Sequence, residues 1–193
     1  MFLSSINALI ILSVTIFLPE QVGAPRKFTA PETFFAKAEA KSAEGAVATA
    51  PITIQIDRYT LEGHRKVVEE ALRTGGYPGF LTALRNAPAV GHIEAGTRKV
   101  TVRYAREVTE GETRTITVVG DVPLFFIGGG NPDSKPRAGY ELSVLQLKMD
   151  SSGIGEGTLA AAARVKPGGP SGVQVDRYAD QLIKLLSVRR EIK

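Results

Sequence analysis

The sequence predicts an α+β fold that is mainly antiparallel β, either a sandwich or an open barrel, with a two-helix hairpin near the start of the domain. Three observations lead to this prediction. From Ile52 onward, apolar residues mostly alternate with polar ones, which is the period of a strand with one buried face. Glycine, proline and polar turn residues separate these runs at regular spacing. The stretch between Thr60 and Pro88 instead has apolar residues at helical spacing.

Residues 1–24 are predicted to be a signal peptide. Residues 1–18 include no charged side chain, and Val22, Gly23 and Ala24 supply the small residues that signal peptidase needs. The alternative is an uncleaved anchor, because the charge-free stretch reaches the short end of the ~17–25 residues that span a bilayer. We therefore expect an exported protein, periplasmic or extracellular, that contacts the membrane transiently through its signal, or one that this segment anchors.

The rest of the chain divides into two predicted parts. Residues 25–51 are rich in Ala, Glu, Lys and Pro. A transient helix over residues 36–43 would have only Phe34 and Phe35 to bury, so we expect a flexible tether. Residues 52–193 are predicted to form a single β-rich globular domain. A chain of 193 residues is long enough for one domain and its extensions, because domains commonly have roughly 100–200 residues. The hydrophobic content of 43% and the charged content of 23% are typical of a globular protein.

The domain is expected to begin with one strand and two helices. Alternating isoleucines predict a half-buried strand over residues 52–56. Thr60 can cap the helix that follows, and this helix ends at Gly75-Gly76. A second short helix stops before Pro88. Two short helices joined by glycines must cover an apolar surface, and a sheet face is the obvious partner.

The remaining apolar segments are predicted to be strands, the second and third of them joined as a hairpin: 90–95, 99–104, 115–118, 124–127, 140–149, 158–165, 173–175 and 182–188. The unbroken apolar run at 124–127 is taken as the centre of the fold. Within 140–149 the apolar residues change parity, which predicts a β-bulge or a strand that is covered on both sides. The alanines of 158–165 also suit a helix, and 182–188 is ambiguous, but we favour strands for both.

Two segments of the chain are near copies of each other. Residues 55–59 read Gln-Ile-Asp-Arg-Tyr and residues 174–178 read Gln-Val-Asp-Arg-Tyr, each after an alternating apolar run. One interpretation is a coincidence between two strand ends. The other is that the two strands lie side by side, or are related by pseudo-symmetry, with equivalent Asp–Arg ion pairs.

Familiar catalytic and cofactor motifs are absent from the sequence. The triple glycine at 128–130 does not form a phosphate loop, because its nearest lysine, Lys135, does not follow it directly. The spacing of Gly153, Gly155 and Gly157 does not fit a dinucleotide fingerprint. The chain has no cysteine, which excludes disulfides, thiolate catalysis and Cys-ligated zinc. We therefore predict no cofactor, no metal site and no catalytic residue.

The two histidines, His64 and His92, are the only imidazoles available for catalysis. A pair between His64 and Asp57 is conceivable, but we favour a solvated or core-edge role for both histidines. A pocket in which either histidine lies within hydrogen-bond reach of an acid would favour an enzyme. Isolated histidines without a deep pocket would favour a binding domain.

The loop after the triple glycine is the predicted ligand-binding element. It presents Asn131, Asp133, Lys135 and Arg137 next to two prolines, and loops anchored by rigid strands often carry recognition. The alternative is a plain long connection. The net charge of +4 is mild and Lys and Arg are scattered, so we expect no nucleic-acid partner.

Three stretches of the chain, 125–130, 135–139 and 160–169, resemble a group of uncharacterised secreted bacterial proteins. The resemblance covers the chain from Ile52 onward. It implies export, and it implies no activity, cofactor or site.

These observations favour an exported, envelope-associated or extracellular domain that binds or supports rather than catalyses, with an unknown ligand and a possible envelope partner. The alternative is a secreted hydrolase with an unrecognised acid/His site. A third, weaker interpretation is a subunit of a larger assembly, which an exposed apolar patch or an unpaired strand edge would indicate.

Overall fold

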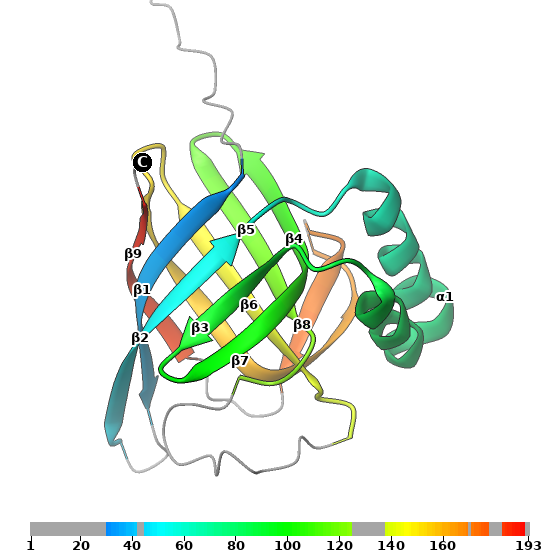
Figure 1. The fold of residues 1–193 in the computed structure, drawn as a ribbon, viewed down its shortest axis with the longest axis horizontal. Coiled ribbons are helices and arrows are strands. Elements are labelled where there is room, and N and C mark those ends of the chain that lie inside the picture. The colour runs from blue at the N-terminus through cyan, green and yellow to red at the C-terminus, as the bar shows by residue number, and fades with distance from the viewer. Residues whose placement is uncertain (1–29, 42–44, 125–137, 170, 178–182, 192–193) are drawn as a thin grey trace, which may run out of the picture.

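The computed structural model describes residues 30–41, 45–124, 138–169, 171–177 and 183–191. These residues form a closed, eight-stranded antiparallel β-barrel with one helical element packed against its outside (Figure 1). The elements in chain order are β1 (Glu32–Lys41), β2 (Val47–Ile56), α1 (Glu62–Asn86), β3 (Gly91–Ala95), β4 (Arg98–Glu110), β5 (Thr113–Gly120), β6 (Leu142–Met149), β7 (Ile154–Pro167), β8 (Val173–Arg177) and β9 (Ile183–Arg190).

The barrel closes because its last strand returns to its first. Strands β1 to β7 pair in chain order, and β9 pairs with both β7 and β1, so these eight strands form the ring. The ninth strand, β8, pairs with β7. The long strand β7 uses one edge for β6 and divides the other between two partners. Its first half pairs with β9 and its second half pairs with β8. The predicted β-rich, mainly antiparallel fold is confirmed. The sheet closes on itself, so the predicted sandwich or open barrel is wrong.

The closing strand β1 lies in the segment for which we predicted a flexible tether. Residues 32–41 and 47–51 of that segment are instead parts of β1 and β2. Antiparallel pairing with β2 and β9 supplies the hydrogen bonds of β1, and Phe34 and Ala38 are buried in the barrel. Alanines are poor strand formers in isolation, but strand propensity depends on the neighbours that a pleated surface provides. The predicted signal peptide, residues 1–24, lies outside the described residues.

The predicted two-helix hairpin is not formed. Residues 62–86 make one helical element, α1, which is interrupted at Gly76 with φ 60° and ψ −157°. Glycine reaches this conformation without steric cost, so the chain bends there and continues as helix. Pro78 follows in the first turn after the bend, where its missing N–H is tolerated.

Helix α1 covers a wall of the barrel and not one of its openings (Figure 1). Its buried side chains Val68, Leu72, Phe80 and Leu84 form an outer apolar cluster with residues of the barrel wall. The wall residues of this outer cluster come from β4, β5, β6, β7 and β8: Tyr104, Val119, Leu142, Val144, Ala160, Ala163, Val165 and Val173. None of the helices in the described part of the chain combines the length and the apolar character needed to traverse a lipid bilayer.

The barrel interior is a second, separate apolar cluster. It includes Phe34, Ile52, Ile54, Ile56, Ile93, Ile116, Val118, Leu145, Leu147 and Leu185, all buried. Eight strands enclose a space that side chains just fill. The change of parity predicted within 140–149 is explained by this arrangement, because Leu142 and Val144 pack under α1 whereas Leu145 and Leu147 point inward. The prediction of a strand covered on both sides is confirmed.

The favoured strands at 158–165 and 182–188 are confirmed by β7 and β9, and the predicted hairpin is confirmed by β4 and β5. Leu124 is buried but follows β5 without belonging to a strand, and residues 125–127 of the predicted central run lie outside the described residues.

The two near copies do not lie side by side. Strand β2 pairs with β1 and β3, whereas β8 pairs with β7. The two aspartates also have different partners: Asp57 accepts a hydrogen bond from Gln55, and Asp176 pairs with Arg164 at 2.7 Å. The interpretation as neighbouring or equivalent strands is therefore wrong, and coincidence between two strand ends remains.

Candidate functional site

Hydrogen bonds from backbone amides, and one to the hydroxyl of Thr60, hold the connection between β2 and α1 (residues 57–61) against the barrel. The amide of Thr60 donates to the carbonyl of Ala105 at 2.9 Å, and the amide of Ala105 donates to Thr60 Oγ1 at 2.9 Å. The amides of Asp57 and Arg58 both point at the carbonyl of Val90, at 2.9 and 3.3 Å. Thr60 is therefore not the helix cap that the sequence predicted, because its hydroxyl serves β4.

A hollow of about 170 Å³ lies between this connection, the start of α1 and the barrel wall. We call it the seam pocket, and its lining residues are Arg58, Thr60, Leu61, His64, Ala87, Pro88, Val90 and Arg103. Its three basic side chains come from three places: the β2–α1 connection, the first turn of α1 and strand β4. The stretch between α1 and β3 supplies apolar wall.

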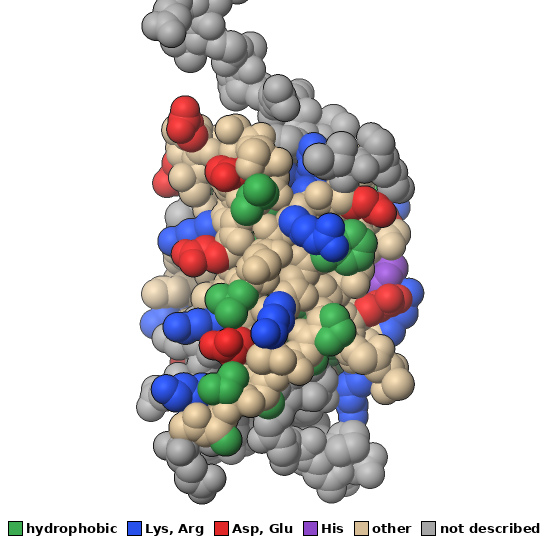
Figure 2. All heavy atoms as spheres, turned by 90° about the vertical axis from the view of Figure 1, so that its left-hand side faces the viewer, with side chains coloured by type: hydrophobic (Ala, Val, Ile, Leu, Met, Phe, Trp, Pro, Cys, Tyr) green, Lys and Arg blue, Asp and Glu red, His purple; other side chains and the backbone are tan. Residues whose placement is uncertain are grey.

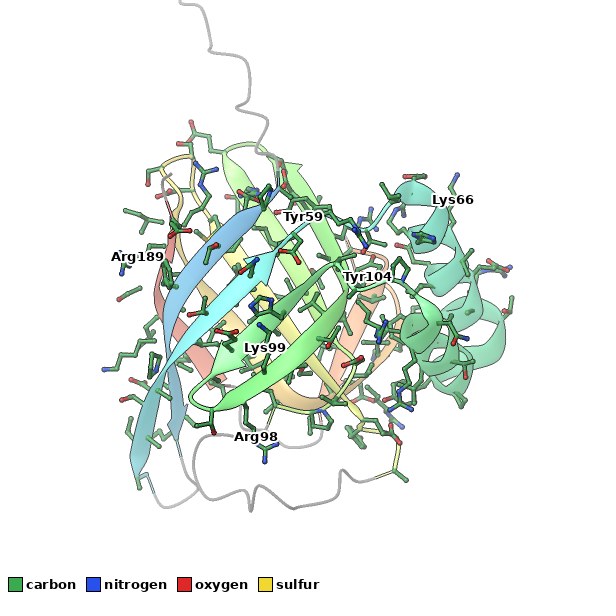
Figure 3. The ribbon with its side chains drawn as sticks, viewed as in Figure 1. Tyr59, Lys66, Arg98, Lys99, Tyr104 and Arg189 are labelled. Atoms are coloured by element: carbon green, nitrogen blue, oxygen red, sulfur yellow. The ribbon has the colours of Figure 1, made fainter. Side chains whose placement is uncertain are left out.

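Arg103 faces the outside of the barrel by alternation with the interior residue Val102, and a β-bulge in β4 turns the next residue, Tyr104, to the outside as well. The register between β4 and β5 shifts between Val102, opposite Gly120, and Tyr104, opposite Val119. Val102 belongs to the interior cluster, and Tyr104 already belongs to the outer cluster. Bulges redirect side chains in this way and are frequent next to functional sites. Two consecutive residues, Arg103 and Tyr104, therefore face the outside of the barrel, and Figure 3 shows Tyr104 between the wall and α1.

Both guanidinium groups of the seam pocket are oriented by the backbone that forms its wall. Arg58 donates to the carbonyl of Ala89 at 2.7 Å, and Arg103 donates to the carbonyl of Ala87 at 2.7 Å. The Nε of Arg103 also donates to Asp121 at 2.8 Å. A guanidinium has five N–H donors, so each arginine keeps donors for another partner.

Among the described residues, those that line the seam pocket include no carboxylate. Asp121 balances the charge of Arg103 through a salt bridge at 2.8 Å. Asp57 accepts its hydrogen bond from Gln55, so the conceivable His64–Asp57 pair is not formed among the described residues. His64 itself is exposed at the rim of the hollow.

A second, more open hollow of about 410 Å³ lies on the other side of residues 57–61, and its charges are already paired. Arg65 bridges Glu62 and Glu69, each at 2.8 Å. Arg106 also reaches Glu69, at 3.2 Å. Because opposite charges satisfy one another here, this hollow offers a ligand less unpaired charge than the seam pocket does.

A buried polar cluster closes one end of the barrel interior. Arg114 on β5 contacts Glu32 on β1 through both guanidinium NH groups, and it also donates to Tyr59 and Glu107, each at 2.6 Å. Burial alone would raise the pKa of the Glu32 carboxyl, but hydrogen bonds from Arg114 and Tyr59 outweigh it and hold this pKa below its usual range. Burial raises the pKa of Tyr59, and the charge of Arg114 offsets only part of that rise.

This arrangement is a structural closure of the barrel. The carboxylate of Glu32 stays charged and bound, and Tyr59 stays protonated and donates to it at 2.6 Å. Neither group is free to exchange a proton with a substrate near neutral pH. Figure 3 shows Tyr59 at this end of the barrel.

The second histidine, His92, has an acidic neighbour and lies outside the seam pocket and the second hollow. His92 Nε2 lies 3.2 Å from Glu94 Oε1, and the same oxygen accepts a hydrogen bond from Lys99 at 2.8 Å. The hydrogen bond from Lys99 holds the pKa of Glu94 below its usual range. Both His92 and Glu94 alternate with the interior residue Ile93, so they lie on the outer surface of β3. They line none of the three hollows described here.

The third hollow is a shallow depression of about 490 Å³ on the outer face of β1, β2 and β9. Arg189 lies over the ring of Phe35 at 5.3 Å, and Lys37 and Thr53 also line the depression. Figure 2 shows acidic, basic and apolar side chains interspersed over this face. Because no single charge or apolar patch dominates, the face does not specify a partner.

The predicted ligand-binding residues Asn131, Asp133, Lys135 and Arg137 lie outside the described residues, so that prediction stays a prediction. Arg58 and Arg103 were not among the residues that the sequence predicted for a site. The alternation of β4 could have placed Arg103 on an outer face, but its place beside Arg58 depends on the path of the β2–α1 connection, whose amides at Asp57 and Arg58 bind the carbonyl of Val90.

The described residues include no group of three or more His, Asp or Glu side chains placed to hold a metal ion. No family model, no curated protein and no solved structure matches this chain.

Proposed function

We propose that the protein is a non-catalytic binding domain and that the seam pocket holds its ligand. One observation carries this proposal: three basic side chains from separate elements, Arg58, His64 and Arg103, meet at one hollow whose other walls are largely apolar. A concave, mostly apolar site with a few converging polar groups is the usual form of a small-molecule site.

The same residues give less support to the alternative of a hydrolase. Hydrolysis by an acid/His site needs a carboxylate within reach of the imidazole and of the substrate. The lining of the seam pocket offers His64 without a carboxylate, and the pair His92–Glu94 lies on an open strand surface. Thr60, the one hydroxyl residue of the lining, already accepts a hydrogen bond from the amide of Ala105.

Export is a separate part of the proposal. The charge-free residues 1–18, the small residues that follow them, and the resemblance to secreted bacterial proteins support a periplasmic or extracellular location with a possible envelope partner. Mass spectrometry of the protein recovered from cell fractions tests it. An N-terminus after about residue 24 in an exported fraction supports export, and an intact Met1 in the cytoplasmic fraction contradicts it.

A matched pair of truncations tests the pocket. Leu61 and Val67 are equally exposed, at 63% and 62%, but only Leu61 lines the seam pocket. The full chain is titrated with benzoate, benzamide, butyrate and butyramide, four small probes of differing charge and shape. We expect Leu61→Ala to lower the affinity for the tightest-binding probe by roughly threefold to tenfold, because it removes apolar contact. Val67→Ala is expected to leave this affinity unchanged. Absence of binding by all four, or equal effects of both truncations, would overturn the proposal.

A further inference from the structure

We propose that the ligand of the seam pocket is a small organic monocarboxylate, that is, one carboxylate on a short apolar body. This inference rests on the proposed function and names the ligand class of that same site. Three properties of the pocket lead to it: its charge, its walls and the geometry of its donors.

The pocket carries one positive charge that the described residues do not balance. Among these residues, no carboxylate lies within 4.0 Å of the Arg58 guanidinium, whereas Asp121 balances Arg103 at 2.8 Å. One unbalanced cation matches one negative charge on the ligand. A dianion would bring a second negative charge close to Asp121.

The walls favour an organic ligand over an inorganic ion. Leu61, Ala87, Pro88 and Val90 present apolar surface to the hollow. An inorganic anion keeps its hydration and leaves this surface wet, whereas an apolar body removes it from water at about 25 cal/mol per Å². The volume of about 170 Å³ is below the ~300–1,000 Å³ of sites for drug-sized ligands, so the body is small.

The donors are held in place before any ligand arrives. The carbonyl groups of Ala89 and Ala87 each accept a hydrogen bond from one arginine, which orients Arg58 and Arg103 on the same wall. The planar guanidinium of an arginine binds a carboxylate through two parallel hydrogen bonds, whereas the ammonium of a lysine acts as a point charge and does not provide this geometry. His64 adds a ring nitrogen from a third element, α1.

The experiment compares each acid with its neutral amide on the full chain. Benzoate is titrated against benzamide, and butyrate against butyramide, with affinities from calorimetry and positions from the amide resonances of the protein. We expect the tighter acid to bind at least tenfold more tightly than its amide, because a charge-assisted hydrogen bond contributes about 1.5–3 kcal/mol. We expect inorganic phosphate to bind more weakly than this acid. The shifted amides are expected at the lining residues of the seam pocket.

Variants at Arg58 separate recognition from folding. Arg58→Gln is expected to weaken binding of the acid about tenfold or more and to leave the amide unchanged, which shows that the pocket is intact. Arg58→Lys keeps the charge but loses the fork, so we expect an intermediate loss. Lys184→Gln removes an exposed charge on β9, away from the seam, and is expected to change nothing.

The outcomes distinguish the two proposals. If an amide binds at the seam pocket as tightly as its acid, or if phosphate binds more tightly than both acids, the ligand class is wrong and the binding function stands. If no probe shifts the amide resonances of the residues that line the seam pocket, the proposed ligand class and the proposed function are both wrong. Equal losses of acid and amide in Arg58→Gln would also overturn the carboxylate assignment.

Discussion

The guanidinium of Arg114 meets the carboxylate of Glu32 inside the barrel, where the two side chains are only 4% and 2% exposed. They come from β5 and β1, strands that are not neighbours in the sheet, so the pair joins the barrel across its interior. The ring of Phe34 lies 6.0 Å from this guanidinium, and Tyr59 and Glu107 also accept hydrogen bonds from it. The pair therefore links the strand that closes the barrel to the opposite wall.

Replacing one partner of this pair tests its contribution to stability. Glu32→Gln leaves Arg114 buried next to Glu107 but without the charge of Glu32, and we expect a loss of about 3 kcal/mol in the free energy of unfolding, because breaking a buried pair commonly costs ~3–5 kcal/mol. Urea unfolding measures this loss. Glu110→Gln, at the exposed end of β4, serves as the control and is expected to stay within about 0.5 kcal/mol of the wild type. Equal stability of the two variants would refute the role of the pair.

The same carboxylate makes stability depend on acid pH. The pKa of Glu32 is lower in the folded chain than in the unfolded chain, so its contribution is complete above the unfolded value of ~4.3 and is lost as the pH falls through the folded value. We expect the stability difference between the wild type and Glu32→Gln to be constant from pH 7 to about pH 5 and to shrink below about pH 4. Urea unfolding along this series measures it, and a difference that grows in acid would have the wrong sign.

The hydroxyl of Tyr104 on β4 hydrogen-bonds to a residue of α1 and to a residue just before β8. Its hydroxyl donates to the carbonyl of Ser171 at 2.7 Å and lies 3.0 Å from Glu69 Oε1. Tyr104→Phe keeps the packing and removes these contacts, so we expect a loss of about 1–3 kcal/mol in unfolding free energy. Affinity for the seam-pocket probes is expected to stay the same, because Tyr104 does not line that pocket. A variant as stable as the wild type in urea would show that these hydrogen bonds contribute nothing.

Adjacent glycines in α1 are expected to respond to alanine in opposite directions. Gly76 has φ 60° and ψ −157°, which an L-residue adopts only with strain, so Gly76→Ala is expected to cost about 1–3 kcal/mol. Gly75 has no neighbour within 4 Å of an added Cβ, and its φ lies outside the left-handed range, so Gly75→Ala is expected to stabilise by about 0.4–1 kcal/mol. Thermal unfolding of both variants checks this, and a shift of the same sign in both would contradict the bend at Gly76.

The sequence predicted the strands whose pattern is local. Alternating isoleucines marked residues 52–56, and the hairpin of β4 and β5 followed from alternation on both sides of its turn. Strand β1 was missed, because its alanines become strand only when β2 and β9 pair with them. Without β1 the sheet has no connection between β2 and β9, so closure of the barrel could not be predicted from a domain that begins at residue 52.

The candidate site could not be predicted from local sequence patterns. Arg58 and Arg103 are distant in sequence. They line one hollow because the amide of Val90 donates to the carbonyl of Val102 on β4, and the carbonyl of Val90 accepts from the amides of Asp57 and Arg58. A bulge shifts the inward–outward order by one residue, so alternation in β4 predicted Tyr104 beside Val100 and Val102 on the inner face. The structure places Tyr104 outside, under α1.

A crystal structure of the protein grown with the tighter of benzoate and butyrate tests the central claim most directly. We predict density for the acid in the hollow bounded by Arg58, His64 and Arg103, with its carboxylate at Arg58 and its apolar end against Leu61 and Pro88. Density for the acid elsewhere, for example in the depression beside Phe35 on β1, with the seam pocket left to water, would contradict the account.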